Sequence, residues 1–95
     1  MHALLRRFDT GDELIVWGMP EPPIGEVYEV WLDHAGGPPQ PTEALFTVTS
    51  AGQGTVEVPG PLLGVREVMV TSEPLGGSSA PTSAAVLRLR VGHAH

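Results

Sequence analysis

The chain has 95 residues, of which 11 are acidic and 5 are basic, so its formal net charge is −6. This length suits one domain with a single core. The acidic balance, without a basic run, argues against binding to nucleic acid. The sequence contains no cysteine, which excludes disulfides, thiolate zinc sites and cysteine nucleophiles. Its 41% hydrophobic and 17% charged residues are typical of a globular chain, not of a disordered one.

Apolar runs in the sequence are short. The longest have about four residues, whereas a membrane span needs about 20. The N-terminal residues 1–7 lack the long apolar region of a signal peptide. We therefore expect a soluble domain, either complete in itself or cut from a longer chain.

Turn-rich clusters divide the chain into segments of strand type. Their spacing is close to the 8–12 residues expected for an all-β sandwich or barrel. Strands are predicted over Ala3–Phe8, Glu13–Gly18, Glu26–Asp33, Thr42–Ser50, Thr55–Val58, Arg66–Glu73 and Ala84–Gly92. The prediction is one all-β domain over residues 1–95, an antiparallel β-sandwich of about seven strands with Greek-key-like connections.

Period-two alternation predicts which side chains face the core. Segment 13–18 is apolar on both faces, which indicates a central strand. In segment 26–33 one face is apolar, whereas the other places Trp31 among acids. We expect Trp31 at a rim or under a loop, and solvent positions for Glu26, Glu29 and Asp33. The predicted interior consists of Tyr28, Val30, Leu32, Val68, Val70, Leu87 and Leu89.

Histidines are the first candidates for chemistry. If the first and last strands lay side by side, His2, His93 and His95 could hold a divalent metal. The alternative is a frayed chain end with exposed imidazoles, and His34 precedes a Gly-Gly turn. We favour the frayed end and predict no metal site and no cofactor.

Acids and hydroxyls give no stronger signal. Asp9, Asp12 and Glu13 surround Gly11 and could bind calcium, but they lack the ligand spacing of a calcium loop. They are also ordinary turn residues, which is the interpretation that we favour. The serines lack a G-x-S-x-G elbow and a patterned histidine partner. The sequence therefore predicts no catalytic residues, and we expect a protein that is not an enzyme.

The most distinctive stretch is VTSEPLGGSSAPT, residues 70–82. Its glycines permit positive φ, and its hydroxyl residues can bond to the local backbone. We expect Glu73 to organise this loop by accepting amide hydrogens, with the amides of Gly76 and Gly77 turned toward it. A structural loop is favoured, with a ligand-binding loop as the alternative. The residues concerned are Glu73, Pro74, Gly76, Gly77, Ser78, Pro81 and Thr82.

A second motif precedes it, LIVWGMPEPPIGEVYEVWLDHAGGPP. In order and spacing the two motifs resemble the C-terminal domain of the anti-sigma-K factor family, which has G-L-P-x-P-P-x-G, Y-x-L-W-L and then V-T-x-E-P-x-G-G-S-x-x-P-T. The resemblance covers residues 14–91. The chain departs from the pattern at Ala44-Leu45 and at Ser72. Matching positions are Gly18, Pro20, Pro22, Pro23, Gly25, Tyr28, Trp31, Leu32, Val70, Thr71, Glu73, Pro74, Gly76, Gly77, Ser78, Pro81 and Thr82.

This resemblance implies the extracytoplasmic sensor or regulatory domain of a membrane-anchored anti-sigma factor, controlling release of its sigma factor without catalysis. The sigma factor would be bound by an N-terminal module that this chain lacks. The implied partners are a protein ligand or a regulatory protease, at the extracytoplasmic face of the cell membrane. A free edge strand could also pair two copies into a homodimer.

Two rival functions remain open. One is a cell-surface module that binds peptide or carbohydrate through Trp17, Tyr28 and Trp31. It requires those aromatic side chains to be exposed together in a groove and not buried separately. The other is a small hydrolase, which has no assembled triad or metal set in the sequence.

Overall fold

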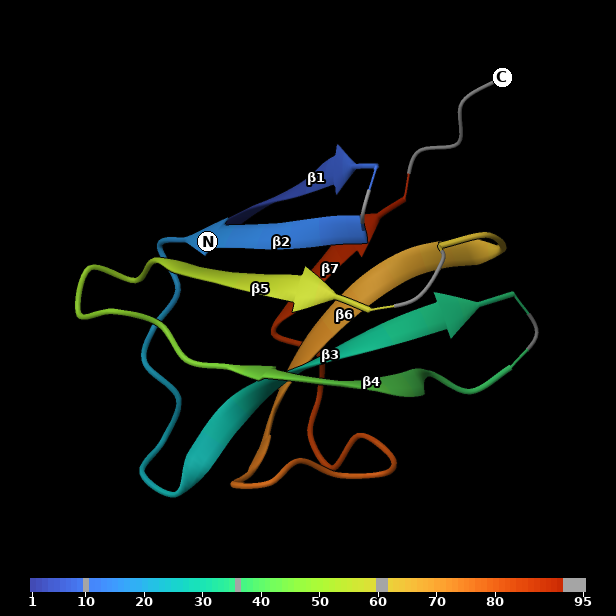
Figure 1. Cartoon of the computed structure of the whole chain (residues 1–95). Coiled ribbons are helices and arrows are strands. Elements are labelled where there is room, and N and C mark those ends of the chain that lie inside the picture. The colour runs from blue at the N-terminus through green and yellow to red at the C-terminus, as the bar shows by residue number, and fades with distance from the viewer. Residues whose placement is uncertain (10, 36, 60–61, 92–95) are drawn as a thin grey trace.

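The computed structural model describes residues 1–9, 11–35, 37–59 and 62–91, which form seven strands in two antiparallel sheets (Figure 1). The first sheet has the order β1-β2-β5 and the second has the order β4-β3-β6-β7. The strands are β1 (His2–Phe8), β2 (Gly11–Trp17), β3 (Glu26–His34), β4 (Gln40–Phe46), β5 (Gly54–Val58), β6 (Val65–Pro74) and β7 (Leu87–Arg90).

The chain passes between the sheets at β2 to β3, at β4 to β5 and at β5 to β6, as in a Greek-key sandwich. The predicted all-β antiparallel sandwich of seven strands is therefore confirmed. The described residues build no helix that is long and apolar enough to span a membrane.

Two predicted strands differ from the observed ones by more than two residues at one end. β4 ends at Phe46, not at Ser50, because the residues that follow form a turn in which the Gly52 amide donates to the Thr49 carbonyl at 2.8 Å. β7 begins at Leu87, not at Ala84. The residues before it belong to a long connection that rejoins the sheet where the Val86 amide donates to the Val70 carbonyl at 2.8 Å.

The core lies between the inner faces of the two sheets. β2 is the central strand of its sheet, as predicted, and buries Leu14 and Val16. The seven side chains predicted to line the interior either belong to this core or pack against it, which confirms the alternation. Three of them are only partly buried: Leu32, Leu87 and Leu89.

An irregularity in β4 shapes one edge of the second sheet. The β3–β4 register shifts between the pairs Glu29–Leu45 and Trp31–Pro41. The Thr42 hydroxyl stabilises the bulge, because it donates to the Val30 carbonyl at 2.7 Å and accepts from the Ala44 amide at 3.1 Å. Glu43, at the centre of the bulge, has a φ of 64°.

The two sheets differ on their outer faces. The outer face of β1-β2-β5 is open, whereas that of β4-β3-β6-β7 is approached by the connection 75–86 between β6 and β7, which we call the covering segment. Figure 1 shows this segment as a folded loop beyond the end of β6. The covered face carries the motif residues of the sequence.

Candidate functional site

The covered face is built by alternate residues of β3 and β6. Trp31 has no exposed surface and lies outside the core between the sheets, which matches its predicted placement under a loop. Glu29, two residues earlier on the same face, is only 1% exposed. The predicted solvent position of Glu29 was therefore wrong. Alternation assigned it to the outer face correctly, but the covering segment folds over that face.

A chain of hydrogen bonds runs through this face from β3 to the covering segment. The Trp31 indole Nε1 donates to Thr71 Oγ1 at 2.7 Å, and Thr71 Oγ1 donates to Glu73 Oε2 at 2.5 Å. Thr82 completes the chain, since its hydroxyl donates to Glu73 Oε1 at 2.6 Å and its amide donates to Oε2 at 3.1 Å. The Glu73 carboxylate, which projects from β6, therefore links the Thr71 hydroxyl of the same strand to Thr82 of the covering segment.

Glu29 holds the same segment at a second point. Its Oε1 accepts the Ser78 amide at 2.7 Å. The backbone comes close here because position 77 has no side chain: a Cβ on Gly77 would lie 3.0 Å from Glu29 Oε1 and 3.1 Å from Leu45 Cδ2. Gly76 and Gly77 have φ values of 93° and 82°, which confirms the predicted positive φ.

Burial and hydrogen bonding shift the pKa values of the two glutamates in opposite directions. Burial raises the pKa of Glu29, and the nearby charge of Glu73 adds to this increase against the lowering effect of the Ser78 amide. Burial also opposes ionisation of Glu73, but hydrogen bonds from Thr71, Thr82 and Ser78 together outweigh it and lower the pKa of Glu73. As the pH falls, Glu29 is therefore expected to take up a proton before Glu73 does.

Opposite shifts in a carboxylate pair can serve acid–base catalysis. Here both carboxylates are almost completely buried under the covering segment. A groove of about 400 Å³ lies beside the segment, between Pro41 and Leu45 of β4 and the loop around Gly77, with Glu29 among its lining residues. The pair is thus placed to hold a loop in position.

The predicted role of Glu73 as organiser agrees with this geometry, but the predicted amide donors were wrong. Thr82 supplies the amide, whereas the Gly77 amide donates to the Pro74 carbonyl at 2.9 Å. The covering segment turns tightly at Gly76 and Gly77, and it contacts Glu73 of β6 five residues further on, at Thr82. No pattern in the sequence indicates which amide of the loop reaches Glu73, although a buried Trp on one face does indicate that its acidic neighbours are covered too.

The histidines and the acidic turn do not form a cation site within the described residues, where no cluster of three or more ligating side chains occurs. The His2 ring stacks on Trp17 with 5.6 Å between centroids. His34 is half-buried, and its Nδ1 has no hydrogen-bond partner among the residues that the structure describes. His93 and His95 lie outside the described residues. Asp12 accepts from Arg7 at 2.6 Å, and Glu13 points to the opposite face of β2.

The aromatic side chains do not share a groove. Tyr28 is buried in the core and donates to the Pro20 carbonyl at 2.5 Å, and Trp31 is buried on the other face of β3. Trp17 is 41% exposed on the other sheet. The geometry required by a binding module using all three aromatics is therefore not met.

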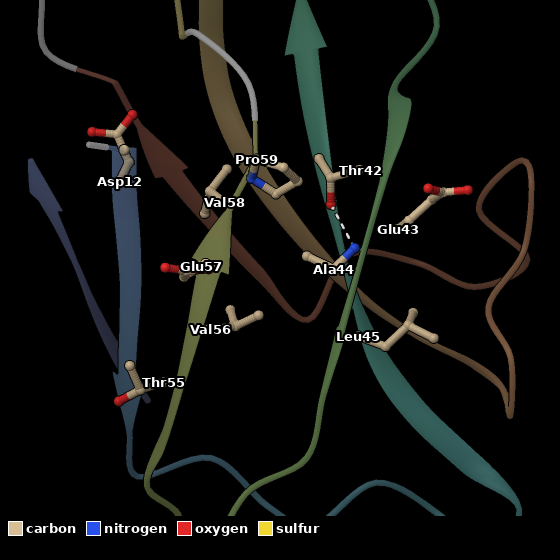
Figure 2. Close-up of a pocket in the computed structure, with 11 residues that line it drawn as sticks. Asp12, Thr42, Glu43, Ala44, Leu45, Thr55, Val56, Glu57, Val58 and Pro59 are labelled. Carbon is tan, nitrogen blue, oxygen red and sulfur yellow. Dashed lines mark hydrogen bonds between the residues drawn. The ribbon is translucent and has the colours of Figure 1, made fainter. Parts of the chain in front are cut away.

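A larger groove, which the sequence did not indicate, lies between the edge strands β4 and β5 (Figure 2). Its volume is about 520 Å³. Figure 2 shows Ala44 and Val56 in the space between the two strands, whereas Glu43 projects from the side of β4 away from β5 and Glu57 from the side of β5 away from β4. β4 and β5 follow each other in the sequence but are edge strands of different sheets, so the groove between them arises only in the tertiary fold.

Comparison with known proteins assigns the chain to a family. A protein of Streptomyces griseus described as "Uncharacterized protein in phr 5'region" is 35% identical over 66 residues, 70% of this chain and 26% of that protein. The chain thus spans about a quarter of that relative's length. No solved structure matches. The family model "Anti-sigma-K factor rskA, C-terminal" matches residues 6–86, from β1 to the end of the covering segment, and the chain therefore belongs to this family.

Proposed function

We propose that this domain is the extracytoplasmic regulatory domain of a membrane-anchored anti-sigma factor and controls release of the sigma factor without catalysis. The observation that carries the proposal is the family match over residues 6–86. This range includes Trp31, Thr71, Glu73 and Thr82, the residues that attach the covering segment to the sandwich. The alternative aromatic binding module has no comparable support.

In this proposal the domain responds to a protein partner or a regulatory protease. A partner can shift a protein between two states only by its different affinity for each of them. A closed covering segment protects backbone that an open one would present to a protease. The sigma factor itself would be bound by another part of the parent protein, which is consistent with the small share of the Streptomyces relative that the chain spans.

The test uses the full-length parent protein in its own cell, with a transcriptional reporter for the sigma factor that it controls. Deletion of residues 6–86 should change reporter output by about tenfold or more, with the amount of parent protein followed by immunoblot. Alkaline phosphatase fused after residue 91 should be active, because this enzyme matures only outside the cytoplasm. An unchanged reporter at equal protein levels, or an inactive fusion, would contradict the proposal.

A matched pair of substitutions separates regulation from simple loss of the protein. Trp31→Ala should open the covered face, whereas Trp17→Ala changes the same residue type on the open face. We expect altered reporter output only for Trp31→Ala, together with faster cleavage of the parent protein. Equal responses of the two variants would count against the covered face as the regulated element.

A further inference from the structure

We propose that the groove between β4 and β5 binds an extended peptide segment of a partner protein, with basic and apolar side chains in alternation. The groove and its charge belong to the folded domain, so this binding does not depend on the regulatory role proposed above. Four features of the groove define the occupant: two free sheet edges, an apolar floor, an acidic rim and the absence of arginine from its lining.

The groove is bounded by sheet edges. β4 is the edge strand of the second sheet and β5 that of the first, and the two edges lie next to each other. An edge strand directs the N–H and C=O groups of alternate residues away from its only neighbour. An extended segment can pair with such groups as an added strand, which is a common mode of peptide recognition. The volume of about 520 Å³ lies within the usual range for binding sites.

The lining separates apolar from charged groups. Ala44 and Val56 occupy the space between the strands, and Val58 and Pro59 lie at one end of it (Figure 2). Leu45 also lines the groove, but its side chain projects from β4 on the side away from β5. Glu43 and Glu57 are exposed at the rim, and neither takes part in an ion pair within the described part of the chain. Asp12, the third acid of the lining, is already paired with Arg7. A strand added to either edge would direct alternate side chains into the apolar space and the others to the outer sides of the strands, where the carboxylates of Glu43 and Glu57 lie.

The distribution of arginine leaves the rim unneutralised. The five basic residues of the chain are arginines in β1, β6 and β7, and none lines the groove. Charge complementarity therefore selects a basic segment over an acidic one. The same carboxylates repel nucleic acid and leave no reason for an anionic ligand. The occupant that fits both the floor and the rim is a basic and apolar β-strand.

The experiment measures binding of a capped hexapeptide, acetyl-Arg-Val-Arg-Val-Arg-Val-amide, to the ¹⁵N-labelled domain by NMR. We expect amide shifts concentrated in β4 and β5, and a dissociation constant that rises at least about fivefold between 0.05 and 0.5 M salt. Two control peptides isolate the two components. Replacing arginine by glutamate removes the charge match, and replacing the central valine by proline removes a backbone donor. Both should bind at least about tenfold more weakly.

Substitutions in the protein provide the matched control. Glu43→Lys with Glu57→Lys reverses the rim and should weaken binding by about tenfold or more. Glu21→Lys with Glu26→Lys makes the same change in net charge away from the groove and should alter affinity less than about twofold. Thermal melting of both variants shows whether each one is folded. If the rim variant unfolds, the single substitution Glu57→Lys, at an exposed position, replaces it.

Three outcomes would overturn the proposal. The first is equal weakening by the two double substitutions, which would mean attraction to net charge alone. The second is the absence of shifts in β4 and β5 at millimolar peptide. The third is a concentration-dependent dimer in sedimentation velocity whose interface covers the groove, because a second copy would then be the occupant.

Discussion

The outer faces of the two sheets use the same alternation of side chains but have opposite environments. On the first sheet, Leu4 is 50% exposed and Trp17 is 41% exposed, beside the stacked His2 ring. On the second sheet, Trp31 and Thr71 have no exposed surface. A tryptophan thus occupies the outer face of both sheets, and only one of the two is buried.

The difference comes from the connections. Only residues 9 and 10 separate β1 from β2, whereas the covering segment between β6 and β7 spans residues 75–86 and is long enough to fold back. Covering a face buries its polar groups, which must then be paired within the protein. Glu73 and Glu29 do this by accepting hydrogen bonds from the segment. The cover and its buried carboxylates therefore depend on each other.

The largest expected effect compares the two tryptophans. Trp31→Ala should lower the free energy of unfolding by about 3–5 kcal/mol, because it leaves a cavity under the covering segment. Trp17→Ala should change it by less than about 1 kcal/mol, since the side chain is partly exposed. Urea denaturation measures both. Similar losses of unfolding free energy for the two variants would contradict this prediction, because they would show that the buried tryptophan stabilises the protein no more than the exposed one.

Removal of the Glu73 carboxylate should have the next largest effect. Glu73→Ala should cost about 1–3 kcal/mol, because the Thr71 hydroxyl and the Thr82 amide lose their acceptor. Glu73→Gln retains one acceptor and should cost less. If the loop is instead a ligand site, Glu73→Ala would leave the melting temperature nearly unchanged while signalling in cells is lost. Glu57→Ala, at an exposed position, is the control.

The close approach of the covering segment can be tested at its two glycines. Gly76→Ala and Gly77→Ala both place a side chain at positive φ, which costs about 1–2 kcal/mol. Only at position 77 does the added Cβ also meet Glu29 Oε1, at 3.0 Å. Gly77→Ala should therefore be the more destabilising in chemical denaturation. A larger loss at position 76 would mean that the segment does not pack on Glu29.

The smallest effect concerns Glu29 and depends on pH. Its raised pKa means that its stabilising contribution is present below the unfolded-state pKa and is lost as pH rises through the folded-state value. Glu29→Gln should thus increase the free energy of unfolding at pH 7, by about 1 kcal/mol, with the gain disappearing in acid. A variant that is less stable than the wild type at pH 7 would contradict this assignment.

Glu73 should give the opposite pH dependence. Its lowered pKa means that its contribution is present above the unfolded-state pKa and is lost as pH falls through the folded-state value. Urea titrations between pH 7 and pH 3 should therefore show a loss of stability in acid that Glu73→Gln reduces. If the free energy of unfolding of Glu73→Gln fell with pH in parallel with that of the wild type, other titrating groups would be the cause of the loss of stability in acid.

Local patterns in the sequence were sufficient to predict the strands and the core of this protein. Hydrophobic alternation is a local property, so it identified β3 and β6 and their inner residues Val30 and Val70. The choice of Glu73 as organiser also followed from local chemistry, because an acid before Pro and two glycines suits an acceptor within a loop. The motif residues were enough to indicate the family.

The features outside that core could not be predicted from local patterns, because they depend on long-range contacts. Ser78 is 49 residues from Glu29 and Thr71 is 40 residues from Trp31, so neither hydrogen bond leaves a periodic trace in the sequence. The β4–β5 groove likewise depends on which strands end as sheet edges. Alternation gives the face on which a side chain lies, but the burial of an outer face depends on where the rest of the chain passes. That path is fixed by long-range packing and hydrogen bonding.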